Sequence, residues 1–208
     1  NLGNTYANKG MIDDAISAYR KAVEINPNLA ESHKSIAYLY KKKGQISESV
    51  SSFEKATTFH PKDTNLFFDL ASLYESNGLQ DNAILTYKKL LSIDPAHKEA
   101  KNSLAMLYNS KGVSLALQGK KEDAIAAYKD ALQNKEYFKE AYNNLGAAYV
   151  DKEMIDDAIA AYKKALEISP NFGEVYNNLG VAHTKKKAYD EAVSAFKKAQ
   201  SHNKNKAV

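Results

Sequence analysis

The side chains most able to do chemistry are the five histidines, His33, His60, His97, His183 and His202. Two imidazoles bind a metal when their spacing puts them on one face, as in His-Glu-x-x-His, and none of the five has such spacing. The chain has no cysteine, so it offers neither a thiolate ligand nor a disulfide. It also lacks a glycine-rich phosphate loop and a nucleophile elbow around a serine. We therefore expect no catalytic residue, no metal, no cofactor and no enzymatic activity.

Asparagine amides are the second chemically suggestive group. Asn1, Asn144 and Asn178 each stand directly before a Leu-Gly pair, and the same column holds Ser35, Asp69 and either Ser103 or Ser110 elsewhere. An amide both donates and accepts hydrogen bonds, so it can pair with an extended peptide backbone of any sequence. The interrupted column has two interpretations, a binding ladder or a residue common to a repeated sequence.

Composition favours helices and argues against two classes of partner. The 208 residues are 44% hydrophobic and 26% charged, with only four prolines and nine glycines. No apolar run reaches the length of a membrane-spanning helix, so we expect no membrane insertion. The net charge of +4 is spread along the chain, which argues against nucleic acid as a partner. The chain begins at Asn1 within a helical pattern, which indicates a fragment of a longer protein, and the lack of cysteine agrees with a cytoplasmic location.

Internal repetition organises the whole sequence. Segments such as DDAISAYRKAVEINP and DDAIAAYKKALEISP recur, and they share a small residue at sequence intervals of 34, 34, 41, 34 and 34: Ala15, Ser49, Ala83, Ala124, Ala158 and Ala192. Upstream of each lies a second phrase, such as NLGNTY, SIAYLY or NLGAAY. The apolar spacing predicts two short amphipathic helices in each unit, joined at a Gly or Lys turn. His183 replaces the Tyr of this phrase, and we expect it to be a packing residue with satisfied hydrogen bonds.

This pattern resembles the tetratricopeptide repeat (TPR) family, with Leu-Gly/Ala then Tyr in the first helix and Ala, Tyr/Phe, Ala in the second. The resemblance implies an all-α fold, an α-solenoid with a right-handed superhelix of tandem helix-turn-helix repeats in one array over 1–208. The repeats are 1–29 (truncated), 30–63, 64–97, 98–138, 139–172 and 173–206. Neighbouring units would supply the surface that one helix pair cannot bury.

Repeat four is seven residues longer than the others and contains two candidate stops, Gly112 and Gly119. Seven residues are about two helical turns, so the insertion returns side chains to nearly the same face. We expect one continuous helix from about Lys98 to Leu117; the alternative is a helix ending near Lys111 followed by a short turn. The lengthening either forms a docking ridge or is an accommodated insertion without function.

The resemblance also implies a concave groove, lined by the first helices, that binds a partner peptide. We expect Asn143, Asn144, Asn177 and Asn178 to hold a peptide backbone, and Asn109 to line the same groove. In this respect the column is similar to the asparagine ladder in the repeats of O-linked N-acetylglucosamine transferase. Tyr38, Phe68, Lys34 and Lys41 would select partner side chains. The alternative for the lysine runs at 41–43 and 185–187 is that they complement the helix dipole.

The predicted function is a non-enzymatic scaffold or adaptor that binds a protein or peptide partner in this groove. Val193 and Phe196 in the last repeat are expected to lie partly open, because no further amphipathic helix follows them. One alternative is therefore a self-assembling structural protein that forms homo-oligomers through its open ends. The other is the substrate-recruiting region of a larger enzyme.

Overall fold

The computed structural model describes residues 2–204 of the chain, and all of its regular secondary structure is α-helical. The helices form in pairs because each segment carries apolar side chains at helical spacing and ends at a turn residue. Their bounds are α1 (Leu2–Asn8), α2 (Ile12–Ile25), α3 (Ala30–Lys43), α4 (Ile46–Phe59), α5 (Thr64–Ser76), α6 (Gln80–Ile93), α7 (Lys98–Leu117), α8 (Lys121–Asn134), α9 (Lys139–Asp151), α10 (Ile155–Ile168), α11 (Gly173–Lys185) and α12 (Tyr189–Lys204).

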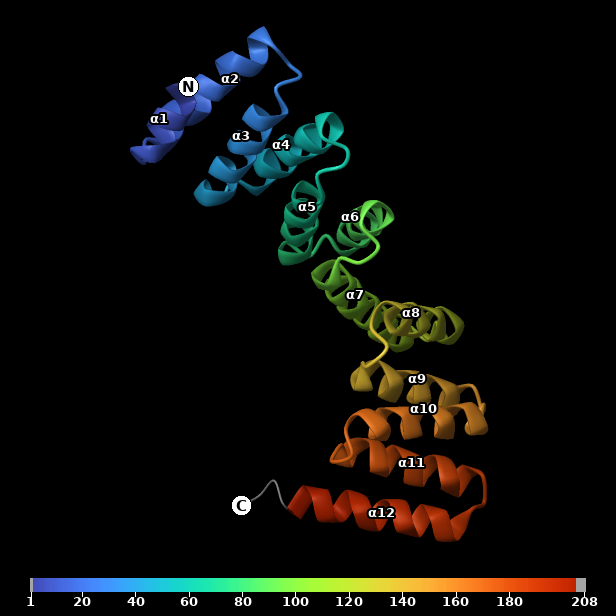
Figure 1. The fold of residues 1–208 in the computed structure, drawn as a ribbon. Helices are drawn as coiled ribbons and strands as arrows, with labels where there is room; N and C mark the ends of the chain where they lie inside the picture. The colour runs from blue at the N-terminus through green and yellow to red at the C-terminus, as the bar shows by residue number, and fades with distance from the viewer. Residues whose placement is uncertain (1, 205–208) are drawn as a thin grey trace. The chain divides into compact units, whose positions relative to one another are not determined.

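The helices divide into two compact units, which end and begin at Ala100 and Lys101. Within the first unit, α1 packs on α2, α3 on α4 and α5 on α6, and each pair contacts the next (Figure 1). Within the second unit, α9 packs on α10 and α11 on α12 in the same way. The predicted all-α fold of tandem helix pairs is therefore confirmed, whereas a single array over 1–208 stays a prediction.

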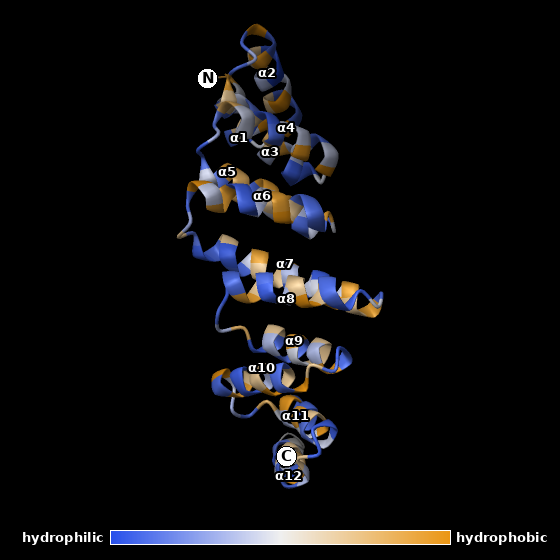
Figure 2. Ribbon diagram, turned by 90° about the vertical axis from the view of Figure 1, so that its right-hand side faces the viewer, coloured by the Kyte–Doolittle hydropathy of each residue, from blue (hydrophilic) through white to orange (hydrophobic). Residues whose placement is uncertain are grey.

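One aromatic side chain of the second helix forms the core of the repeat in five of the repeats. Tyr19, Phe53, Tyr87, Tyr128 and Tyr162 occupy this position, and each exposes 5% of its surface or less. Several of these rings lie directly against a glycine of the first helix. A methyl group added at Gly146, for example, would come within 2.5 Å of the Tyr162 ring. Hydrophobic and hydrophilic residues alternate along the helices (Figure 2), as in amphipathic helices that bury one face.

Ion pairs between successive repeats recur at a constant sequence separation of 30. Lys43 pairs with Asp13, Lys152 with Glu122, and Lys186 with Asp156, each joining the end of a first helix or its turn to the start of the preceding second helix. The hydrogen bond from Lys152 lowers the pKa of Glu122. The lysine runs therefore contribute to contacts between repeats. Exposed pairs of this kind contribute little to stability, because water and salt screen them.

The turn between the two helices of a repeat contains one residue in the left-handed conformation. In four repeats it is a glycine, Gly10, Gly44, Gly78 or Gly119, with φ between 73° and 76°. In the last two repeats it is Glu153 (φ 59°) and Lys187 (φ 63°). A side chain in this region costs about 1–2 kcal/mol, because its Cβ approaches the following carbonyl oxygen.

Replacing Glu153 by Gly is expected to raise the free energy of unfolding by about 0.5–1 kcal/mol, since relief of this strain exceeds the extra chain entropy of glycine. Urea denaturation followed by circular dichroism measures the change. Glu153→Ala is the matched control, because it removes the carboxylate but keeps a Cβ. An equal gain from Glu153→Ala would show that charge, and not backbone conformation, is responsible.

The lengthened repeat contains one continuous helix, α7, which confirms the first of the two expected structures. Gly112 lies inside this helix and is buried, and a Cβ added there would meet the Tyr128 ring at 2.5 Å. Gly119 is the turn residue, with φ 76°. The two glycines therefore have different roles, since one permits close packing and the other ends the repeat's first helix. The last turn of α7 is open to solvent, and Leu117 is 85% exposed.

Gly112→Ala is expected to lower the free energy of unfolding by about 1 kcal/mol. The methyl group adds helix propensity worth about 1 kcal/mol, but overpacking against the buried Tyr128 ring costs about 1–3 kcal/mol. The measurement is a thermal or urea unfolding curve. Ser114→Ala, on the exposed side of the same helix, is the control. Stabilisation by Gly112→Ala would contradict the close contact.

Candidate functional site

Four of the predicted asparagines form two hydrogen-bonded pairs on the first helices of the second unit. The Nδ2 group of Asn144 on α9 donates to Oδ1 of Asn109 on α7 at 3.0 Å. The Nδ2 group of Asn178 on α11 donates to Oδ1 of Asn143 on α9 at 2.9 Å. Both pairs have a sequence separation of 35, which is one residue more than the 34-residue repeat. Each donor is therefore bonded to the asparagine that precedes its equivalent position in the previous repeat. The structure thus brings these four side chains together in cross-repeat pairs.

Asn143 is the most constrained of these amides. Its side chain is 6% exposed, and its Nδ2 group donates to Oε1 of Glu174 at 3.0 Å. With its oxygen accepting from Asn178, both ends of this amide are bonded within the protein. Asn144 and Asn178 are half-buried, and Asn177 is exposed. Asn143 therefore holds its neighbours in place, and Asn144, Asn177 and Asn178 are the amides with surface toward solvent. Asn1 lies outside the described residues.

Sequence reasoning missed Glu174, which completes this network. Glu174 lies four residues before Asn178 on α11, so both side chains stand on one helical face. The spacing of Glu174 and Asn178 could have indicated that the carboxylate lies near the asparagines. It could not indicate the partner of Glu174, because Asn143 lies one repeat earlier. The chain Asn178–Asn143–Glu174 links α9 to α11 by two hydrogen bonds.

Two of the predicted residues of the first unit, Lys34 and Tyr38, are held by carboxylates at the N-cap and in the second turn of α5. Lys34 on α3 lies 3.7 Å from Asp63, and the Tyr38 hydroxyl donates to Asp69 on α5. Partial burial, followed by this hydrogen bond and the nearby carboxylates, raises the pKa of Tyr38. Tyr38 also packs its ring edge-on against Phe53, with centroids 5.1 Å apart. Its hydroxyl and ring are therefore fixed, while 37% of its surface stays exposed.

Phe68 and Lys41 differ in exposure. Phe68 on α5 is half-buried, and its ring stacks on His97 at 5.3 Å and meets Tyr87 edge-on at 5.8 Å. Lys41 near the end of α3 is exposed. The nine predicted residues thus fall into two groups, four in the first unit and five in the second, each positioned by its own helices.

The prediction that His183 has satisfied hydrogen bonds is wrong. The Nδ1 atom of this side chain is buried and has no hydrogen-bond partner among residues 2–204, so the ring is not satisfied as expected. The equivalent Tyr74 donates to Glu54 at 2.6 Å, which helps raise its pKa to about 12 after the larger effect of burial. The position of Glu54 is occupied by Lys163 on α10. A lysine ammonium only donates hydrogen bonds, so Lys163 cannot act as the acceptor that Glu54 provides for Tyr74.

Two other kinds of site are absent from the part of the chain that the structure describes. It contains no group of three or more His, Cys, Asp or Glu side chains placed to hold a metal ion. None of its helices combines the length and hydropathy needed to cross a membrane.

Asn143→Ala is expected to lower the free energy of unfolding by about 1–3 kcal/mol, because the Asn178 amide and the Glu174 carboxylate each lose a partner. Asn177→Ala, the exposed neighbour on α11, is the matched control and should stay within about 0.5 kcal/mol of the parent. Guanidinium unfolding curves give both values. Equal effects of the two substitutions would show that the buried amide adds nothing to the packing of α9 on α11.

Solved structures of repeat proteins resemble this chain. A crystal structure of MamA protein has 28% sequence identity, with 86% of this chain and 93% of that chain covered and a TM-score of 0.59. YrrB, described as a TPR protein with an unusual peptide-binding site, has 18% identity, 89% and 92% coverage and a TM-score of 0.54. MamA from Desulfovibrio magneticus RS-1 has 18% identity, 85% and 96% coverage and a TM-score of 0.54. A search of the curated proteins gave no match.

Family models identify the repeats directly. Models described as tetratricopeptide repeat match residues 30–63, 64–97, 140–172 and 173–206, and a TPR repeat model matches 3–44. Together these segments span more than half of the chain, and the four tetratricopeptide repeat segments coincide with the pairs α3–α4, α5–α6, α9–α10 and α11–α12. The chain therefore belongs to the tetratricopeptide repeat family.

Proposed function

We propose that this protein is a non-enzymatic interaction scaffold that binds an extended segment of a partner protein along its first helices. The observation that carries this proposal is the set of cross-repeat amide pairs, Asn144 with Asn109 and Asn178 with Asn143. Each pair occupies one end of each amide and leaves further hydrogen-bonding capacity on the half-buried Asn144 and Asn178. These groups, with the exposed Asn177, would bind the partner's backbone.

The amides are suited to this task because they are ordered before a partner arrives. Immobilising a flexible side chain on binding costs about 0.5–1.5 kcal/mol. Asn178 is already fixed by Asn143, which Glu174 holds in turn. Backbone recognition by such amides would be independent of the partner's sequence, so its selectivity must come from other residues.

Side-chain selection is assigned to the first unit. Tyr38 and Phe68 offer aromatic surface, and Lys34 and Lys41 offer positive charge on the same helices. Tyr38 is oriented by Asp69 and Lys34 by Asp63. The description of YrrB as peptide-binding agrees with this function, although at 18% identity the likeness concerns the fold alone.

The test uses a photo-crosslinking amino acid at position 177, in an extract of the source organism. We expect it to capture a distinct protein, and the captured segment is then synthesised for binding measurements. Asn144→Ala combined with Asn178→Ala should weaken its binding about tenfold, since two hydrogen bonds of about 0.5–1.5 kcal/mol each are lost. The same crosslinker at position 160, an exposed alanine on α10, is the control.

Two outcomes contradict the proposal. One is capture of the same proteins from positions 160 and 177, which would indicate nonspecific contact. The other is unchanged affinity of the captured segment after both asparagines are replaced.

A second candidate function, self-assembly, is favoured by the open face of α12. Tyr189, Val193 and Phe196 are 63%, 52% and 38% exposed and follow one another at helical spacing. If this stripe mediates association, the sedimentation coefficient rises with concentration and Val193→Glu abolishes the rise. Leu85→Glu, at another exposed apolar residue, is the control. The enzyme-recruiting alternative and the cytoplasmic location stay predictions.

A further inference from the structure

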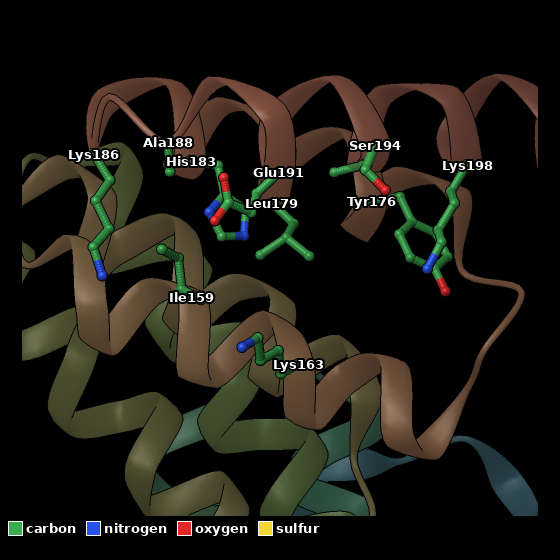
Figure 3. Close-up of a pocket in the computed structure, with 11 residues that line it drawn as sticks. Ile159, Lys163, Tyr176, Leu179, His183, Lys186, Ala188, Glu191, Ser194 and Lys198 are labelled. Atoms are coloured by element: carbon green, nitrogen blue, oxygen red, sulfur yellow. The ribbon is translucent and has the colours of Figure 1, made fainter.

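A groove of about 460 Å³ lies between α10, α11 and α12, on side chains that the proposed backbone-binding amides do not use. Its floor includes Leu179, and its rim carries Lys163 from α10, Lys198 from α12 and Lys186 from the turn after α11. Figure 3 shows His183 and Leu179 between these three lysines. One carboxylate, Glu191, also lines the groove. The rim is thus predominantly positive over an apolar floor.

At the equivalent place in the first unit, between α2, α3 and α4, the lining is divided between two grooves of about 320 Å³ and about 440 Å³. Tyr40, which is 6% exposed, lines both grooves, and the Arg20 guanidinium lies 5.6 Å from its ring centroid. The next equivalent pair in the second unit, Lys129 and Tyr149, has the same geometry at 5.8 Å. In these junctions a tyrosine ring lies beneath the cation.

The α10–α12 groove differs because His183 stands where these tyrosines stand. The imidazole is a smaller ring without a hydroxyl, and Lys163 occupies the position of Arg20 and Lys129. The buried Nδ1 atom of His183 has no partner among the described residues. This junction therefore keeps the cation of the other two junctions, as Lys163, but has His183 in place of their tyrosine.

The charges of the rim favour an anion. Lys186 is paired with Asp156 at 2.6 Å, and the Lys198 ammonium lies 5.5 Å from the Tyr176 ring centroid. Lys163 and Lys198 thus exceed the single carboxylate of Glu191 within the groove. The junction between α4 and α5 shows that a carboxylate can be accommodated at this place, because Glu54 accepts the hydrogen bond of Tyr74 there.

We propose that the α10–α12 groove binds a short acidic peptide segment of a protein partner. Lys163 and Lys198 bind a carboxylate of the segment, and a neighbouring apolar side chain packs on Leu179 in the space that a tyrosine fills elsewhere. A protein is favoured over nucleic acid because the floor is apolar and Glu191 would repel a continuous phosphate backbone. The site does not depend on the asparagine pairs and offers the scaffold a second point of attachment.

The test is a titration of the 15N-labelled protein with an end-capped octapeptide that alternates glutamate and leucine. We expect saturable shifts of the His183 and Ala195 amides, and binding that weakens with added salt. His183→Tyr restores the ring of the equivalent junctions and should weaken binding at least about tenfold while the protein stays folded. Lys198→Glu should do the same, whereas Lys55→Glu, at the equivalent position in one of the grooves that Tyr40 lines, should leave the affinity unchanged.

Four results would overturn the site. The first is equal binding of an octapeptide that has lysine in place of glutamate, and the second is unchanged octapeptide affinity of Lys198→Glu or His183→Tyr. The third is that Lys55→Glu weakens binding as much as Lys198→Glu does, and the fourth is that chemical shifts change only at the asparagine pairs. Lys198→Glu decides the matter if His183→Tyr alters folding. The variant with Asn144→Ala and Asn178→Ala should bind the octapeptide as the parent does, so failure of this site is distinguishable from failure of the amide site.

Discussion

Four of the repeats depend on the contact between one aromatic ring of the second helix and a glycine of the first helix. The contact at Gly146 and Tyr162 shows how little room is left, since even a methyl group would collide with the ring. Interiors are packed to a density at which one added carbon is felt, so this ring sets the distance between the two helices. The turn residue then needs a left-handed conformation to return the chain at that distance. The regularly spaced ion pairs between repeats add only surface contacts to a geometry that the ring has already fixed.

Much of the fold could be predicted because its causes are local in the sequence. The apolar spacing within a single repeat determines each helix pair, and the insertion keeps the faces of α7 in phase, so its continuity was predicted as well. Val193 and Phe196 were expected to be partly open, and their exposures of 52% and 38% confirm this.

The candidate site was less predictable because its contacts cross repeats at an offset that differs from the period. Columns of equivalent residues group Asn144 with Asn178, whereas the hydrogen bonds join Asn178 to Asn143, at a sequence separation of 35. The role of Glu174 depends on rotamers of two helices that are adjacent only in the folded chain. His183 shows the same limit, since its replacement of a tyrosine is visible in the sequence but the lack of a partner depends on which residue α10 places beside it.

The two turns added to α7 have a consequence for how such a protein can change over time. An insertion of this length rotates the helix by close to a whole number of turns, so residues on both sides of it keep their partners. The Tyr128 ring packs against Gly112 in the lengthened helix in the same way as the Tyr162 ring packs against Gly146 in a helix of ordinary length. An insertion of one and a half turns would instead direct the buried stripe toward water. Insertions in a repeat's first helix are therefore tolerated only when their length is close to a whole number of turns. A gain of two turns creates a new exposed surface, such as that around Leu117, without any compensating substitution.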